Sequence, residues 1–307
     1  MSKRTIVTAT LICLLAQVAS MRCAISAQVT KSRGNWPKVS YGKEIHNLTA
    51  PVDFFSSFVP TKFSSPVAAF IQGAGLRPIT NPTTITESGS YVLLRDIALG
   101  APGTAIVIAA DNVSLNLNGH ALIGPGNKQG VGVAVEGVSG VSVHDGMISG
   151  FGTCVSIVNA HNVRAESLQI RGEDGGGPPP GEVGVLVLNS RGVVLRENTI
   201  SRTFLGIFVR GGGSGGNRIS ANTITGGQNG QIGICYNPDG SSNPAGPKGD
   251  LVYNNLISRF NIGIQTSIQT LGNIFRENNI AFFQQAINEV TPGSNVFEEN
   301  TAIAITP

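Results

Sequence analysis

Residues 195–201 read LRENTIS, and variants of this phrase return four times before the C-terminus. The later copies read ISANTIT, VYNNLIS, FRENNIA and FEENTAI, at residues 219–225, 252–258, 275–281 and 297–303. Their aligned asparagines are separated by 24, 33, 23 and 22 residues, and they are Asn198, Asn222, Asn255, Asn278 and Asn300. A short phrase that returns at this period is typical of a solenoid, in which every repeat adds one coil.

A second phrase repeats in step with the first, and in it a small residue precedes alternating apolar positions. Its six copies begin at Gly132, Cys154, Gly184, Gly206, Gly233 and Gly263. Alternation with period two predicts strands that bury one face, so the chain is expected to be all-β. The residues predicted to point inward are Val133, Val135, Val155, Ile157, Val185, Val187, Ile207 and Val209. Those predicted to point outward are Ala134, Ser156, Leu186, Phe208, Cys235 and Gln265.

The asparagine column is interpreted as part of the scaffold. In stacked coils, each side-chain amide can bond to the backbone at a coil corner and to the amide of the next coil. We therefore predict one continuous ladder of asparagine side chains and assign it no binding role.

The N-terminus predicts an exported, secreted or periplasmic protein. Lys3 and Arg4 precede the apolar residues 6–19, and small residues follow, as in a secretory signal. The apolar run is shorter than the about 20 residues that span a membrane. The expected organisation is a signal peptide at 1–27, an N-terminal cap or linker at 28–83 and a parallel β-helix domain at 84–307.

The predicted cap covers the first coil of the solenoid. It holds a cluster of phenylalanines between Phe54 and Phe70, and residues 64–73 are expected to form a short helix. A solenoid exposes the apolar interior of its first coil, so a covering segment at this end is expected.

Cys154 and Cys235 are predicted to remain separate thiols. They lie three coils apart in the repeat, which corresponds to about 14 Å at about 4.8 Å per stacked strand. A disulfide requires Cα atoms within about 7 Å. Of the two, Cys235 is expected to be the more exposed, because it falls on the outward alternation.

Charge and composition limit the partners. The formal net charge of +3 and the lack of a lysine- and arginine-rich run argue against nucleic acid. No second apolar segment like the first occurs, so no membrane contact is expected once the signal is removed. The chain is expected to act as a monomer.

Residues 85–124 are similar to the opening coils of a known superfamily. The stretch includes Ser88-Gly89-Ser90-Tyr91 ahead of Leu115-Asn116-Leu117-Asn118-Gly119. It resembles the right-handed parallel β-helix superfamily, the pectate-lyase-like fold, and its secreted "right-handed β-helix region" proteins. That group includes uronan epimerases and a periplasmic maturation factor for the copper site of nitrous-oxide reductase. The resemblance covers residues 84–306 and implies a single-stranded right-handed parallel β-helix solenoid. It does not fix the chemistry, since the relatives include hydrolases, lyases, epimerases and binding proteins.

Two chemistries known in this superfamily lack their motifs here. The polygalacturonase branch uses clustered aspartates with Gly-His-Gly and Arg-Ile-Lys elements, and none of these is present. Calcium, which pectate lyases of this fold use, takes six to eight oxygen ligands. The acidic residues Glu173, Asp174 and Asp239 are scattered. No cofactor is predicted, and calcium stays open as an alternative that this pattern does not support.

Arginine gives the more informative pattern. Residues 191–276 hold eight lysines and arginines against three acidic residues. Arg202 and Arg259 occupy the same repeat column two coils apart, which corresponds to about 10 Å. The planar guanidinium group of arginine can donate two parallel hydrogen bonds to a carboxylate. We therefore predict a groove for an acidic polysaccharide or another glycan. The residues predicted to bind it are Arg202, Arg259, Asp239 and Phe208, and those predicted to act near the chemistry are Lys248, Tyr236 and Arg210.

Three functions stay open on this sequence. The first is a lyase or epimerase that acts on an acidic polysaccharide, and the second is a non-catalytic β-helix that binds a glycan or a surface partner. The third is an enzyme acting on a small molecule, roofed by the insertions near residues 171–182 and 237–248. The arginines can also be read as solvated turn residues paired with Glu197 and Glu277. His120 and the His144-Asp145 pair are interpreted as structural, because no nucleophile or metal-ligand spacing accompanies them.

Overall fold

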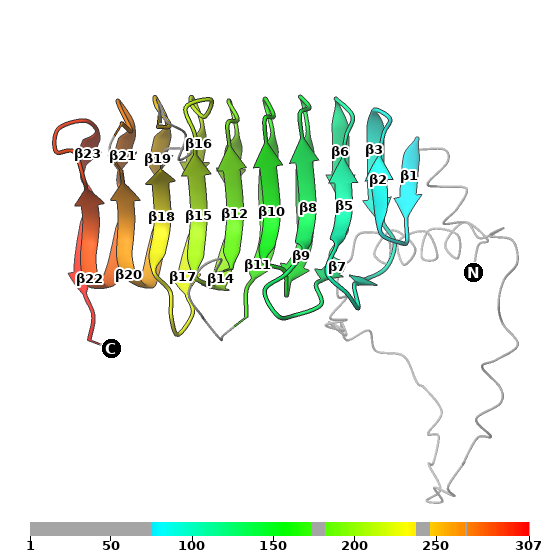
Figure 1. Ribbon diagram of the computed structural model, residues 1–307, viewed down its shortest axis with the longest axis horizontal. Coiled ribbons are helices and arrows are strands. Elements are labelled where there is room, and N and C mark those ends of the chain that lie inside the picture. Colours follow the sequence, from blue (N-terminus) through cyan, green and yellow to red (C-terminus); the bar gives the residue numbers. More distant parts are fainter. Residues whose placement is uncertain (1–74, 174–181, 238–245, 268, 307) are drawn as a thin grey trace, which may run out of the picture. The chain divides into compact units, whose positions relative to one another are not determined.

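The computed structural model describes residues 75–173, 182–237, 246–267 and 269–306. Within these ranges the chain forms 24 β-strands and no helix, and the strands stack as successive coils (Figure 1). The predicted signal peptide, most of the predicted cap, and Asp239 lie outside the described residues.

Each full coil contributes strand segments to three faces. The first face contains β2 (Thr83–Ile85), β5 (Thr104–Ile108), β8 (Val131–Glu136), β10 (Thr153–Val158), β12 (Val183–Leu188), β15 (Leu205–Arg210) and β18 (Ile232–Asn237), then the second halves of β20 (Leu256–Thr266) and β22 (Asn279–Glu289).

The second face contains β1 (Leu76–Ile79), β3 (Gly89–Leu93), β6 (Val113–Asn116), the first halves of β9 (Ser142–Ser149) and β11 (Arg164–Arg171), then β13 (Val194–Arg196), β16 (Arg218–Ser220), β19 (Leu251–Tyr253), β21 (Ile274–Arg276) and β23 (Val296–Glu298). The third face contains β4 (Ile97–Ala98), β7 (Ala121–Ile123), β14 (Thr199–Thr203), β17 (Thr223–Gly226), β24 (Thr301–Ala304) and the remaining halves of β9, β11, β20 and β22.

The strands of each face pair in parallel from one coil to the next, as a parallel β-helix requires. The predicted all-β solenoid is confirmed. Because β1 already pairs with β3, the stacked coils begin at Leu76, ahead of the boundary expected at residue 84.

The predicted inward columns form the core. Val133, Val155, Val185 and Ile207 follow one another through β8, β10, β12 and β15, and each is completely buried. Burying such a side chain contributes about 1.5–3 kcal/mol relative to leaving it exposed. The repeated apolar phrase therefore supplies the main driving force for stacking.

The asparagine ladder is also confirmed. The side-chain Nδ2 of Asn198 donates to Oδ1 of Asn222 at 3.0 Å, and Asn222, Asn255 and Asn278 each donate to the next asparagine at 2.9 Å. The backbone N–H of each of these asparagines also donates to Oδ1 of the next asparagine in the ladder, at 3.0 to 3.1 Å. The ladder thus pairs polar groups at the corner between the second and third faces, where the strand ladders are interrupted.

A second ladder, which the sequence reasoning missed, lies at the corner between the first and second faces. It consists of Asn217, Asp250, Asn273 and Asn295, all buried. Asp250 accepts bonds from the backbone N–H and Nδ2 of Asn217, at 2.8 and 3.1 Å, and its own N–H donates to Oδ1 of Asn273 at 3.0 Å. One carboxylate thus occupies a position where the other members are amides.

Asn222→Ala is expected to lower the free energy of unfolding. The change removes the acceptor of two bonds from Asn198 and leaves buried groups on both neighbouring coils without partners, each costing about 1–3 kcal/mol. Urea denaturation measures the change. The control is Thr223→Ala, an exposed change on the same coil, which should cost less. Equal loss in both variants would contradict the structural role of the ladder.

Asp250→Asn is expected to stabilise the chain increasingly as pH rises. Burial raises the pKa of the Asp250 carboxyl in the folded chain, although the bonds from Asn217 lower it. The native Asp250 is therefore most favourable below its unfolded pKa and loses stability as pH rises through its folded pKa. Denaturation from pH 4 to pH 8 should show a growing gain for the variant. Glu298→Gln, at an exposed carboxylate, should show no such trend, and a gain that shrinks with pH would contradict this account.

Candidate functional site

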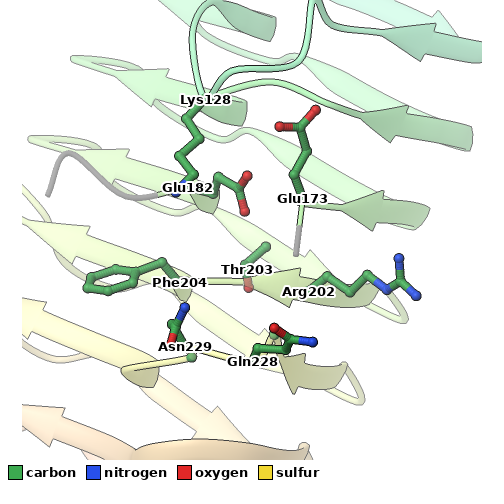
Figure 2. A pocket seen from close by; sticks show the side chains of 10 residues that line it. Lys128, Glu173, Glu182, Arg202, Thr203, Phe204, Gln228 and Asn229 are labelled. Atoms are coloured by element: carbon green, nitrogen blue, oxygen red, sulfur yellow. The ribbon is translucent and has the colours of Figure 1, made fainter. Parts of the chain in front are cut away.

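A pocket lies at the corner where the third face passes into the first. It is lined by Lys128, Glu173, Glu182, Arg202, Thr203, Phe204, Gly227, Gln228, Asn229 and Gly230 (Figure 2). These residues come from four of the five coils that stack at this corner, namely from the loop before β8, the ends of β11 and β14 and the turn before β18. The corner between β9 and β10 lies within this stack and contributes no lining residue. Glu173 and Glu182, the described residues on either side of the lengthened segment noted in the sequence, both line this pocket.

Glu182 is the most buried charged side chain of this pocket, at 3% exposure. Its backbone carbonyl accepts the N–H groups of Phe204 and Leu205 at 3.1 and 3.0 Å, which fixes it at the start of β12. Figure 2 shows the Lys128 side chain extending toward Glu182, with Glu173 on the far side of Glu182 from Lys128. A buried carboxylate needs positive charge nearby, and Lys128 is the lysine placed to supply it.

Thr203 and Arg202 form the next part of the wall. The Thr203 hydroxyl is buried and makes no hydrogen bond within the described part of the chain. The Arg202 backbone takes a left-handed φ of 58°, and its side chain points away from Glu182 toward solvent (Figure 2). Arg202 therefore lies at the rim of the pocket and can contact a ligand that extends beyond it.

Arg202 and Arg259 do share a column, as predicted. Ser201, Thr225 and Ser258 lie side by side in the parallel register of β14, β17 and β20. Arg202 directly follows Ser201 in the chain, and Arg259 directly follows Ser258. Both are exposed, and Arg259 repeats the left-handed backbone with a φ of 60°. Two parallel strand spacings separate them, about 10 Å.

Arg210 and Lys248 lie at the opposite edge of the first face. Arg210 ends β15 and pairs with Leu188 and Asn237. The length of this strand, about 17 Å, therefore separates it from the corner that holds Arg202. Its guanidinium carbon is 6.0 Å from the ring centre of Phe208. Lys248 pairs with Gly215, which pairs with Arg191, and these residues line a separate shallow depression. The predicted residues therefore fall into two groups, one on each side of the first face.

Tyr236 cannot contact a ligand on the surface, so its predicted role near the chemistry is wrong. Its side chain is completely buried and packs edge-on against Phe275, with ring centres 5.4 Å apart. Burial, together with the charge of Asp250, raises the pKa of its hydroxyl well above the ordinary value. The register explains the error, because Tyr236 continues the inward column of Val187 and Val209.

The two cysteines are separate thiols, as predicted, but Cys235 is not exposed. Cys154 and Cys235 are both free and buried, with Cys235 at 4% exposure. Burial raises the pKa of each thiol to about 12. Cys235 does occupy the outward column, where it lies between Phe208 and Gln265 in the register. Neither thiol is available as a nucleophile.

The outer surface of the first face carries a column of apolar side chains. Half-buried apolar side chains follow one another at the start of four of its strands, namely Val183, Leu205, Ile232 and Ile262, and Thr153 separates them from Val131 in the same column. A second outward column contains Leu186 and Phe208. The cationic residues thus flank an apolar strip rather than a charged groove.

A protein-family model described as "Periplasmic copper-binding protein (NosD)" matches residues 107–305. The chain belongs to the NosD family. That family description is consistent with export of this chain. No curated protein sequence gives a match.

Solved structures show the same fold. The Dettilon tailspike protein (gp208) matches with a TM-score of 0.52 and 17% identity, over 75% of this chain and 55% of that one. DFA-IIIase from Arthrobacter chlorophenolicus A6 without its lid matches with a TM-score of 0.52 and 13% identity, over 76% of this chain and 62% of that one. Full-length tailspike protein 2 from an Escherichia coli O157:H7 bacteriophage matches with a TM-score of 0.54 and 13% identity, over 78% and 36%. The chain thus spans less than two thirds of each of these proteins.

The donor residues that the structure of this NosD-family chain describes do not fit a copper centre. In the described ranges, no three histidine, cysteine, aspartate or glutamate side chains converge on one point. The two thiols stay protonated and buried, whereas copper takes deprotonated sulfur or neutral imidazole. Nor does any described residue belong to a helix long and apolar enough to cross a membrane.

Proposed function

We propose that this NosD-family chain is an exported β-helix protein that binds an acidic polysaccharide at the Arg202–Arg259 edge and acts on it as a lyase or epimerase. The observation that carries the proposal is the pair of exposed arginines, held two coils apart beside a pocket that contains carboxylates and a lysine. A polymer with regularly spaced carboxylates can occupy both guanidinium groups at once. Linked contacts of this kind raise affinity without any single strong site.

The pocket supplies groups suited to proton transfer next to a bound carboxylate. Elimination and epimerisation of a uronate both begin with removal of the proton next to the carboxyl group. Arg202 would hold the carboxylate and stabilise the charge that develops on it. Glu173 lines the same pocket, with its side chain directed toward the loop before β8 (Figure 2), and it is the carboxylate that we assign as the base.

The remaining predicted residues fit a peripheral role in this proposal. Arg210 and Lys248 lie across the first face from the pocket, so they would contact a more distant part of the polymer. Phe208 would contribute its ring beside Arg210. Asp239 stays a proposed ligand contact whose position is not described. The chain is proposed to work as a monomer and without a cofactor.

A second function, an enzyme acting on a small apolar molecule, is favoured by one observation. The column from Val183 to Ile262 presents apolar surface on the first face. A ligand bound there would be held by burial of apolar area rather than by charge. Such a ligand would not respond to loss of Arg202 and Arg259.

The double variant Arg202→Ala, Arg259→Ala is expected to lose at least about tenfold in affinity for pectate, alginate or chondroitin sulfate. A charge-assisted hydrogen bond contributes about 1.5–3 kcal/mol, and about 1.4 kcal/mol corresponds to tenfold in affinity. Binding is measured by titration at low and moderate salt. The matched control is Arg164→Ala, Arg218→Ala, which removes the same charge from two exposed arginines also two coils apart, on the second face.

The control variant should keep its affinity within about twofold, since steering by net charge alone is a weak effect at moderate salt. Equal loss in both double variants, or loss in neither, would contradict the site. Release of unsaturated product, or exchange of the C5 proton, tests the chemistry and should fall in Glu173→Gln. Binding without either reaction would assign the chain to the non-catalytic class.

A further inference from the structure

Three polar side chains from two neighbouring coils converge on the second face, whereas the pocket lies at the corner between the third and first faces. Ser114 lies on β6, and His144 and Asp145 lie on β9. The Ser114 Oγ is 3.5 Å from His144 Nε2, and His144 Nδ1 is 2.8 Å from Asp145 Oδ2. The order hydroxyl, imidazole, carboxylate is that of a nucleophile activated by an oriented base.

The backbone explains how adjacent residues can contact each other here. Successive side chains of a regular strand point to opposite faces, so His144 and Asp145 would normally diverge. Asp145 instead has a left-handed φ of 61°, at the bend where β9 passes from the second face to the third. This bend brings the carboxylate to the side of the imidazole and fixes the ring.

The hydrogen-bond directions follow from this contact. A carboxylate only accepts, so His144 Nδ1 carries the proton and Nε2 presents its lone pair to Ser114. The Ser114–His144 distance is longer than in a reacting complex, as is common in the absence of a substrate. Side-chain exposures of 27% for His144 and 56% for Asp145 leave the group open to solvent.

Asn116 provides a donor beside the group. It lies directly across from His144 in the parallel register and two residues from Ser114 on the same strand, so all three share one face. Its Oδ1 accepts the N–H of Asn118 at 2.6 Å, which leaves its NH₂ group to donate. The next residue in the His144 column, Glu166, is engaged by Arg196 at 3.6 Å and Arg164 at 3.7 Å.

We propose that Ser114, His144 and Asp145 form an ester-hydrolysing site that acts by acyl transfer. Ser114 Oγ bonds to the acyl carbon while His144 Nε2 takes its proton, and the Asn116 amide donates to the oxyanion. The ester C–O bond then breaks and the alcohol leaves with the proton from His144. Water, deprotonated by His144, attacks the acyl-serine and releases the acid, which restores the hydroxyl.

The open position of the group sets the substrate class. The three residues lie on the outer surface of a sheet, so they fit an acyl ester that projects from an extended molecule rather than one enclosed in a cavity. This inference does not depend on the proposed binding of acidic polysaccharides. Ser114 and Arg202 lie on different faces, so the two sites can be tested independently.

The test uses the full chain with a fluorophosphonate probe and p-nitrophenyl acetate. The probe should label the peptide that contains Ser114. Ser114→Ala and His144→Gln should each lower the rate of p-nitrophenyl acetate hydrolysis by at least about 100-fold. Asp145→Asn should slow labelling, and Asp145→Glu should recover part of the rate without a change in thermal stability.

The matched control is Ser142→Ala. Ser142 follows Ser114 in the same column on the next coil and makes no hydrogen bond to His144 in the described structure. Its turnover should stay within twofold of the native chain. The proposal is overturned by absence of both labelling and turnover in the intact chain, by label on another serine, or by equal losses in Ser114→Ala and Ser142→Ala. Circular dichroism melting confirms that each variant is folded.

Discussion

Hydrogen bonding between successive coils is the constraint on which the rest of the structure depends. The strands of each face pair in parallel with the same strands of the coils before and after. Corners interrupt this pairing, and a buried corner would leave N–H and C=O groups without partners. The two ladders supply those partners from side chains. Asparagine suits the position because it both accepts and donates along the stack.

The same stacking brings distant residues together. Arg202 and Arg259 are far apart in sequence yet lie only two strand spacings apart. Ser114 and His144, separated by 30 residues, come within hydrogen-bond reach for the same reason. In a solenoid, a functional group is therefore assembled across coils and cannot be recognised as a local motif. This is why the NosD-family fold says little by itself about the chemistry.

Features that depend only on the repeat could be predicted from the sequence. The asparagine ladder, the inward valine column and the separation of Cys154 from Cys235 all follow from register. Features that depend on corner geometry could not. The pocket around Glu182 joins loops of different coils. The contact between His144 and Asp145 requires a left-handed residue at the corner, and this conformation recurs at Ser167, Glu197 and Ala221 in the following coils. The residue types at these positions differ, so the sequence does not mark them. Tyr236 is a different case, since the alternation itself placed it inside.

The most direct measurement is hydrogen exchange of the backbone amides of Asn198, Asn222, Asn255 and Asn278, resolved by NMR. Each of these N–H groups donates to the side chain of the next coil. They should exchange only through global unfolding, with protection close to that of the core strands. Exchange at the rate of an unstructured peptide would contradict the ladder. It would also contradict the stacked arrangement that assembles each of the two proposed sites from residues of different coils.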